Sequence, residues 1–266
     1  MHDWHDEHSW PDASPPVLTV HGDVATITLN RPQHRNRLHD EDLRRLLEYF
    51  EQVNADDRVR VLVLTARTQP PTRIFSAGYH IGEFDEGGRA PMPFERVPDA
   101  LSRVRALTIC ALSGSVYGGA TDLALACDFR VGVEGMEFRM PAAALGLHYY
   151  PSGLRRYVAR LGLGATRRLF LLAEPVDAHG LLSMGYLDRV VPPGQLAHAV
   201  HEWADRAAQL APLALQGMKQ TIQEMAWGED RMNDWRAREA LTQSSADFAE
   251  GRAAFAERRS PSFSGR

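Results

Sequence analysis

The sequence predicts an α/β fold, in which a buried sheet is layered with helices, followed by a mostly helical C-terminal region. Short runs rich in β-branched residues alternate with segments of helical spacing as far as Ser152, and helical spacing dominates beyond it. The chain has 266 residues. This length is enough to bury a sizeable core, as one domain or as one domain with a smaller lobe.

Composition argues against a membrane-spanning protein and against a nucleic-acid binder. Hydrophobic residues make up 44% and charged residues 24% of the chain, as in soluble proteins. No apolar run reaches the length of about 18 residues that crosses a bilayer. The formal net charge of -4 provides no basic field for a polyanion. We therefore expect no membrane partner and no nucleic-acid partner.

Cysteine usage and the N-terminal sequence indicate a cytoplasmic location. Cys110 and Cys127 lie in apolar runs without the spacing of a metal cluster, so we expect no disulfide framework. The first residues lack the basic region and the apolar segment of a secretory signal.

Residues 1–16 are predicted to form a flexible N-terminal arm. Three histidines spaced by three residues could hold a metal if the arm were helical: His2, His5 and His8. Three prolines in the same segment disfavour that helix: Pro11, Pro15 and Pro16. We expect an arm and no metal site.

The first predicted elements are a hairpin, a helix and a buried strand. Two β-branched runs within 18–30 are separated by a turn at Gly22, which is typical of a hairpin. A helix capped by Asp40 follows, with apolar residues at helical spacing: Leu43, Leu46, Leu47, Phe50 and Val53. Residues 59–66 are almost continuously apolar, as in a strand that is covered on both faces.

Later elements repeat this alternation. Residues 94–107 have helical spacing, although Pro98 is expected to kink or shorten the helix. The remaining predicted strands are 108–114, 129–133, 136–140 and 187–191, and the remaining predicted helices include 120–126, 195–209 and 212–227. Residues 83–100 also mix glycine, proline and charge, which favours a plain surface loop over a substrate lid.

Two glycine junctions share one design. In 74–81 and in 115–126, a strand-like run reaches glycine and turns toward a helix-like run. The first N–H groups of a helix lack partners inside it, so each junction is a potential anion site. Two such N–H groups could hold the oxygen of a carbonyl that becomes an oxyanion, although a Gly-Gly pair alone is more often a sign of tight packing.

Six segments in order resemble the landmarks of the crotonase, or enoyl-CoA hydratase/isomerase, superfamily. They are LNRPQHRNRL (29–38), FSAGYHI (75–81), SGSVYGGATDLALACD (113–128), LGLHYYPSGLRR (145–156), AEPVDAHGLLSMGYLDRVV (173–191) and FAEGRAAFAERRSPSF (248–263). The resemblance covers the chain from about Val17 onward. It implies a crotonase (ClpP-like) ββα superhelix over 17–191 and a helical trimerisation region over 192–266. It further implies a homotrimer or homohexamer and an acyl-CoA thioester substrate, with no cofactor besides the CoA of that substrate.

The resemblance also implies particular site residues. The oxyanion-hole N–H groups fall on Tyr79 and Gly119. The residues expected to bind the substrate or its CoA are Arg37, Leu38, Ala77, Gly78, Ile81, Gly118, Met140, Arg258 and Arg259. The three arginines could equally be exposed residues on a solvated face.

One departure from the family pattern concerns acid–base chemistry. Hydratases of the superfamily carry two glutamates, and this chain has Asp122 and Ala142 at those places. Asp122 could be catalytic or could only complement the N-terminus of its helix. Without the second carboxylate, positioned acid–base help worth about 10²–10⁴ in rate is hard to supply for water addition.

Further candidates have two interpretations each. His80 could orient a carboxylate or only form a hydrogen bond in its loop. Tyr149 and Tyr150 could pack or could direct a phenol into the pocket, and His148 lies beside them. This region resembles methylmalonyl-CoA decarboxylases, in which an oxyanion hole and a tyrosine hydroxyl suffice without a carboxylate.

The sequence thus predicts an acyl-CoA lyase or isomerase that stabilises a thioester enolate. Asp122, His80 and Tyr149 are the candidate handlers of a proton or a carboxylate. Three alternatives stay open: an enoyl-CoA hydratase that uses Asp122 alone, a retro-Claisen hydrolase that activates water with His80 or His148 and Asp122, and a non-catalytic acyl-CoA-binding or scaffold protein.

Overall fold

The computed structural model describes residues 14–69, 71, 73–80 and 92–266. Ile81, the three N-terminal histidines and residues 83–91 of the predicted surface loop lie outside these ranges. Among the described residues, no helix is both long enough and apolar enough to span a membrane.

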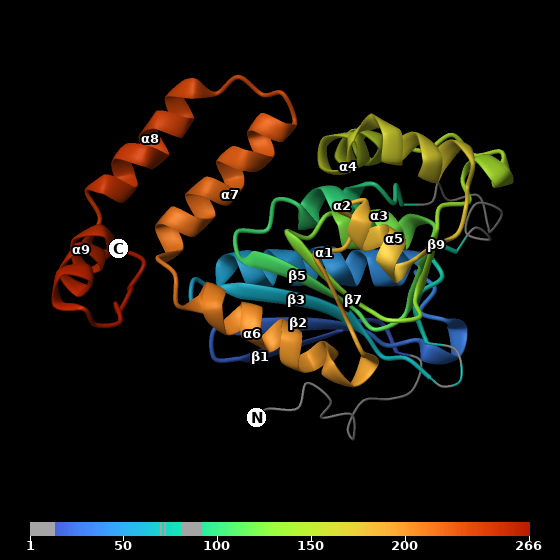
Figure 1. Cartoon of the computed structure of the whole chain (residues 1–266), viewed down its shortest axis with the longest axis horizontal. Helices are drawn as coiled ribbons and strands as arrows, with labels where there is room; N and C mark the ends of the chain where they lie inside the picture. The colour runs from blue at the N-terminus through green and yellow to red at the C-terminus, as the bar shows by residue number, and fades with distance from the viewer. Residues whose placement is uncertain (1–13, 70, 72, 81–91) are drawn as a thin grey trace.

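A six-stranded sheet forms the centre of the chain (Figure 1). Its order is β1 (Val17–His21), β2 (Val24–Leu29), β3 (Val61–Ala66), β5 (Leu107–Leu112), β7 (Phe129–Val133) and β10 (Arg189–Val191). β1 and β2 pair antiparallel, which confirms the predicted hairpin, and the other pairs are parallel. Nearly every residue of β3 is buried, as its continuous apolar run predicts.

A second sheet of four short strands positions the glycine junctions. Its order is β4 (Ile74–Ser76), β6 (Ser115–Tyr117), β8 (Glu137–Arg139) and β9 (Val176–Asp177). β4, β6 and β8 run parallel, and β9 pairs antiparallel with β8. The carboxyl ends of β4 and β6 therefore point the same way, and the junctions follow directly after them.

The helices divide into a group that covers the sheets, in which α4 packs mainly on α3, and a group that extends from them. The first group is α1 (Asp40–Ala55), α2 (Arg96–Leu101), α3 (Gly119–Leu125), α4 (Pro151–Leu171), α5 (Ala178–Ser183) and α6 (Leu196–Ala208), and α6 packs on β5 and β7. The second group is α7 (Pro212–Ala226), α8 (Met232–Gln243) and α9 (Ala246–Glu257), which extend away from the sheets (Figure 1). Within the described ranges there are also three short 3₁₀ turns: Pro32–His34, Ala143–Leu145 and Pro193–Gln195.

Two helix predictions need correction. The helix expected over 94–107 covers only Arg96–Leu101, in line with the expectation that Pro98 would kink or shorten it. Arg105 donates to backbone carbonyls of Val53, Asp56 and Val59 and holds the segment after this helix against the end of α1. Asp40 is the first residue of α1 and not its cap. The N–H of the capping residue, His39, donates to Asp42 at 2.9 Å instead.

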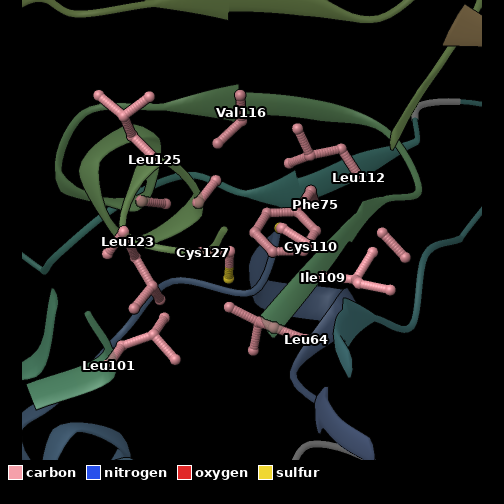
Figure 2. Packing of buried hydrophobic residues seen from close by; sticks show 14 of the residues in the cluster. Leu64, Phe75, Leu101, Ile109, Cys110, Leu112, Val116, Leu123, Leu125 and Cys127 are labelled. Carbon is pink, nitrogen blue, oxygen red and sulfur yellow. The ribbon is translucent and has the colours of Figure 1, made fainter. Parts of the chain in front are cut away.

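One hydrophobic core joins the two sheets to the helices. Figure 2 shows side chains from β3, β4, β5, β6, α2 and α3 meeting in it, among them Leu64, Phe75, Leu101, Ile109, Val116 and Leu123. Cys110 and Cys127 are buried in the same core as free thiols. Burial raises the pKa of Cys110 well above its usual value, so this thiol behaves as a small apolar side chain.

A close backbone contact at Gly114 keeps β4 and β6 side by side. The N–H of Ser115 donates to the carbonyl of Arg73 at 2.9 Å. A Cβ at Gly114 would collide with that same carbonyl group. Glycine at this position therefore allows the approach that brings the two junctions together.

Gly114→Ala is expected to lower the free energy of unfolding by about 1–3 kcal/mol, because the new methyl group must displace the backbone at Arg73. Urea unfolding followed by circular dichroism measures the loss. Gly164→Ala in α4 is the matched control, since a Cβ at Gly164 meets no atom within 4 Å. Equal losses in the two variants would contradict a role for the contact at Gly114.

Candidate functional site

The two glycine junctions touch each other. Gly78 has a positive φ of 88°, a conformation that favours glycine. A Cβ at Gly78 would lie 2.8 Å from the carbonyl oxygen of Tyr117 and 3.2 Å from the nitrogen of Gly119. Both the backbone conformation and the close approach therefore require glycine at this position.

The backbone N–H groups of Tyr79 and Gly119 are the two that the sequence predicts as oxyanion donors. The backbone N–H of Leu38 donates to the carbonyl oxygen of Gly78, and the backbone N–H of His80 donates to the carbonyl oxygen of Leu38, each at 2.9 Å. In a parallel bridge of this kind, the N–H of the residue between the two partners, Tyr79, points away from Leu38. Gly119 is the first residue of α3, so its N–H has no partner inside that helix.

Both residues line a pocket of about 490 Å³. The described residues around it are Ala77, Gly78, Tyr79, Pro93, Phe94, Glu95, Tyr117, Gly118, Gly119, Met140, Pro141, Ala142, Leu145, Leu147, His148, Tyr149, Tyr150 and Pro151. Most are apolar or aromatic. Within this described lining, Glu95 is the one acidic residue, and no lysine or arginine takes part.

Phe94 covers the second junction. A Cβ at Gly119 would lie 2.8 Å from the Phe94 ring, so the ring packs directly on the backbone at Gly119. The Phe94 ring centre is 5.7 Å from that of Tyr79 and 6.3 Å from that of Tyr150. Both Phe94 and Glu95 were predicted as part of the helix over 94–107, with no role in the site. No sequence signal separates them from other loop residues, because their place depends on the path of the chain before α2.

The tyrosines of the opposite wall are linked to Asp122. The rings of Tyr149 and Tyr150 stack at 4.1 Å, and the Tyr149 hydroxyl donates to the Tyr150 hydroxyl at 2.9 Å. The Tyr150 hydroxyl donates to Asp122 Oδ2 at 2.6 Å. Asp122 itself has no exposed surface and is not part of the described lining. It reaches the pocket only through Tyr150.

Arg156 neutralises this buried carboxylate. Its Nη1 lies 2.5 Å from Asp122 Oδ2 and its Nη2 lies 2.7 Å from Asp99 Oδ1. Burial raises the pKa of Asp122, and the Arg156 guanidinium opposes that rise. Burial also holds the pKa values of Tyr149 and Tyr150 well above their usual range. Both phenols are therefore protonated at neutral pH.

Two small residues shape this wall. A Cβ at Gly153 would lie 2.5 Å from the Tyr149 ring, 2.6 Å from the Tyr150 ring and 3.1 Å from Asp122 Oδ2. Glycine therefore allows the first turn of α4 to approach the tyrosines and Asp122. Ala142 is buried and lines the pocket, so its position contributes a methyl group and no carboxylate.

The other predicted site residues divide into two groups. Ala77, Gly78, Gly118, Met140 and His148 line the pocket with Tyr79 and Gly119. His80 and Leu38 are not part of the described lining; the His80 ring lies 4.8 Å from the His39 ring, and Leu38 is buried. The Tyr79 hydroxyl donates to Asp40 at 2.7 Å, which ties the first junction to α1.

The structure does not bring the predicted CoA-binding arginines to the pocket lining. Arg37 is exposed. Arg258 ends α9 and Arg259 follows it, on the side of the chain opposite α4 (Figure 1). Arg259 pairs with Glu250 and Glu257, each at 2.6 Å.

Sequence reasoning also missed Arg156 and Asp99. A signal for Arg156 was present: it stands three residues after Gly153 and directly before Tyr157, on the buried face of α4. A charged residue on such a face predicts a buried partner. The identity of that partner could not be read from the helix alone.

Known proteins match the chain over nearly its whole length. The family model described as enoyl-CoA hydratase/isomerase matches residues 19–266. The 2,3-dehydroadipyl-CoA hydratase of Escherichia coli (strain K12) is 30% identical over 249 residues, 91% of this chain and 96% of that protein. The methylmalonyl-CoA decarboxylase of the same organism is 26% identical over 257 residues, 94% of this chain and 97% of that protein.

Solved structures agree with the sequence relatives. Pseudomonas aeruginosa DspI has a TM-score of 0.84 and 31% identity, with coverage of 97% of this chain and 99% of that one. A putative enoyl-CoA hydratase/isomerase family protein from Hyphomonas neptunium has a TM-score of 0.86 and 27% identity, with coverage of 95% and 98%. The predicted crotonase fold and superfamily are confirmed, and the chain belongs to the enoyl-CoA hydratase/isomerase family.

Proposed function

We propose that this acyl-CoA enzyme stabilises a thioester enolate and catalyses a lyase or isomerase reaction, with decarboxylation as the preferred case. One observation carries the proposal. Tyr79 and Gly119, the residues proposed to donate their backbone N–H groups, line a pocket whose other wall is Ala142 and the tyrosine pair. In this arrangement the thioester oxygen accepts both N–H groups, and each such donor contributes about 3 kcal/mol to transition-state stabilisation.

An apolar wall suits decarboxylation. When CO₂ leaves, the electron pair of the broken C–C bond moves into the enolate, and its charge rests on the thioester oxygen. The step needs no base, and desolvation of the substrate carboxylate favours it. The absence of lysine and arginine from the described lining leaves that carboxylate without a counter-ion there. A proton from solvent then completes the reaction at carbon, because both tyrosine hydroxyl protons are directed toward Asp122.

Asp122 acts in this proposal through Tyr150 and not on the substrate. It is fully buried and hydrogen-bonded to Tyr150 and Arg156. A direct base must reach the proton that it removes, at about 2.6–3.2 Å or through one water. The hydratase alternative with Asp122 alone is therefore disfavoured by burial as well as by Ala142.

A mass-spectrometric screen of malonyl-, methylmalonyl-, enoyl- and aromatic acyl-CoA thioesters tests the proposal. We expect loss of CO₂ from a malonyl-type thioester, and Gly78→Ala should slow it by about 10²–10³-fold because its Cβ displaces the N–H of Gly119.

Gly135→Ala is the control for this variant. Gly135 also has a positive φ, of 78°, but a Cβ there meets nothing within 4 Å. Its alanine variant therefore carries backbone strain without touching the pocket. Binding of acyl-CoA without turnover of any thioester would support the non-catalytic alternative, whereas no binding of any acyl-CoA or of CoA in calorimetry would contradict both the catalytic proposal and the ligand assignment.

Glu95 supports a second candidate, acid–base isomerisation or hydration of an enoyl thioester. It is half-buried and is the acidic residue of the described lining. If it is the base, Glu95→Gln should reduce hydration or isomerisation of crotonyl-CoA by about 10²–10⁴-fold. The same assay on Asp122→Asn compares the effect of removing the carboxylate behind the wall with the effect of removing the carboxylate of Glu95 in the lining. Fast hydration that survives Glu95→Gln and is lost in Asp122→Asn would contradict both candidates.

We also propose that the chain forms a homotrimer or homohexamer through its C-terminal helices. Large apolar side chains are exposed on and beside α7, α8 and α9: Leu210, Met218, Ile222, Met225, Leu241, Phe248 and Phe255. Patches of this kind mark interaction surfaces. Light scattering should give three or six times the chain mass of 29.7 kDa. A monomer mass would contradict the proposal.

A further inference from the structure

One buried guanidinium joins the two walls of the pocket. Arg156 has 1% of its side chain exposed and contacts both Asp122 in α3 and Asp99 in α2. α2 directly follows Phe94 and Glu95, and α4, which carries Arg156, directly follows Tyr149 and Tyr150. Each wall of the pocket is therefore attached to the same side chain through one helix.

The charge of Asp122 sets the direction of the hydroxyl protons. An ionised carboxylate can only accept hydrogen bonds, so Tyr150 must donate its one hydroxyl proton to Asp122. The Tyr150 oxygen then accepts the proton of Tyr149. The Tyr149 hydroxyl has no proton left to donate, and its oxygen can only accept hydrogen bonds from a substrate. A protonated Asp122 could donate to Tyr150, and the chain could then reverse and make Tyr149 a donor.

We propose that Arg156 is the positioning residue of this site: it keeps Asp122 ionised, directs both tyrosine protons toward Asp122, and ties α2 to α4. Tyr149 then gives no hydrogen bond to a substrate carboxylate, so the carboxylate keeps none of the stabilisation that would slow its loss as CO₂. This catalytic consequence rests on the proposed function, whereas the direction of the hydroxyl chain does not.

Loss of Arg156 should make stability depend on pH. In Arg156→Gln, burial raises the pKa of Asp122 without an opposing guanidinium. A carboxyl whose pKa is higher in the folded state favours folding only when protonated. The stability of this variant should therefore fall further below that of the natural protein as pH rises through the raised pKa. The other groups around Asp122 are Asp99, which adds to the rise, and phenols that stay neutral in this range: Tyr149, Tyr150, Tyr157 and Tyr186.

Arg130→Gln is the matched control. Arg130 has 3% of its side chain exposed, pairs with Asp188 at 2.8 Å and donates to the backbone carbonyls of Cys127 and Tyr186. It is absent from the described pocket lining. Asp188 keeps 30% of its side chain exposed, so water can solvate its charge when Arg130 is removed. Arg130→Gln should thus be destabilised by a similar amount at all pH values.

The experiment compares urea midpoints at pH 5.5 and 8.5 for the natural protein, Arg156→Gln, Arg156→Lys and Arg130→Gln. The urea midpoint of Arg156→Gln should lie further below that of the natural protein at pH 8.5 than at pH 5.5. For Arg130→Gln, the difference in urea midpoint should be the same at both pH values. Arg156→Lys keeps the positive charge and should restore a constant gap. Parallel gaps for both glutamine variants would overturn the assignment of Asp122 as an ion held by Arg156.

Kinetics on a thioester that the natural protein consumes test the catalytic part. Arg156→Gln should lower kcat on the order of 10²-fold with little change in KM, because it misplaces groups without removing substrate contacts. Arg130→Gln should keep kcat, and an unchanged kcat in Arg156→Gln would overturn the positioning role. If no thioester is consumed but the difference in urea midpoint between Arg156→Gln and the natural protein grows with pH, the proposed function fails, whereas the inference that Arg156 keeps Asp122 ionised is supported.

Asp99→Asn covers the case in which Arg156→Gln does not fold at either pH. It weakens only the connection to α2 and leaves the contact with Asp122 in place. The charge of Asp99 raises the pKa of Asp122, so its removal should not make the stability gap widen as pH rises, while kcat falls. An unchanged kcat in Asp99→Asn would overturn the proposed link between the two walls.

Discussion

The parallel pairing of β4 with β6 is the constraint on which the site depends. Both strands are three residues long, and the chain leaves each of them at a glycine junction. The absence of a side chain at Gly114 lets β6 approach the backbone at Arg73, and the absence of a side chain at Gly78 lets the first junction approach the backbone at Tyr117 and Gly119. Tyr79 and Gly119, forty residues apart in sequence, thereby line one pocket, and in the proposed function their backbone N–H groups bind the thioester oxygen. Fixed backbone donors of this kind need no reorganisation when charge develops on a substrate oxygen.

Charge inside the apolar wall is confined to one compensated cluster. Taking an isolated carboxylate out of water is unfavourable by several kcal/mol, and Asp122 is fully buried. Arg156 and the Tyr150 hydroxyl provide the compensation. Since Asp99 also binds Arg156 and keeps 23% of its side chain exposed, the cluster connects the buried carboxylate to the partly solvated edge of α2. The same residues therefore stabilise the fold and determine which hydrogen-bonding groups the pocket presents.

Local sequence patterns predicted elements well where packing follows directly from the pattern. The hairpin at Gly22 and the buried run of β3 agree with expectation because turn chemistry and apolar continuity are local properties. The helix predicted over 94–107 is present but shortened, as Pro98 led us to expect, and the segment after it is held by Arg105 at the end of α1, a contact that no periodicity records. Asp122 was expected as a base or as a helix-terminal charge, yet its carboxylate belongs to a cluster with α4.

The sequence by itself determined the family, the positions of both glycine junctions and the loss of a carboxylate at Ala142, since these follow from residue identity and order along the chain. Only the tertiary structure decided that Asp122 lies behind the tyrosines and that Phe94 and Glu95 line the pocket. Arg156 stands 34 residues from Asp122 and 57 from Asp99. Contacts over such separations depend on how the helices pack on the sheets, which no local pattern of residues specifies.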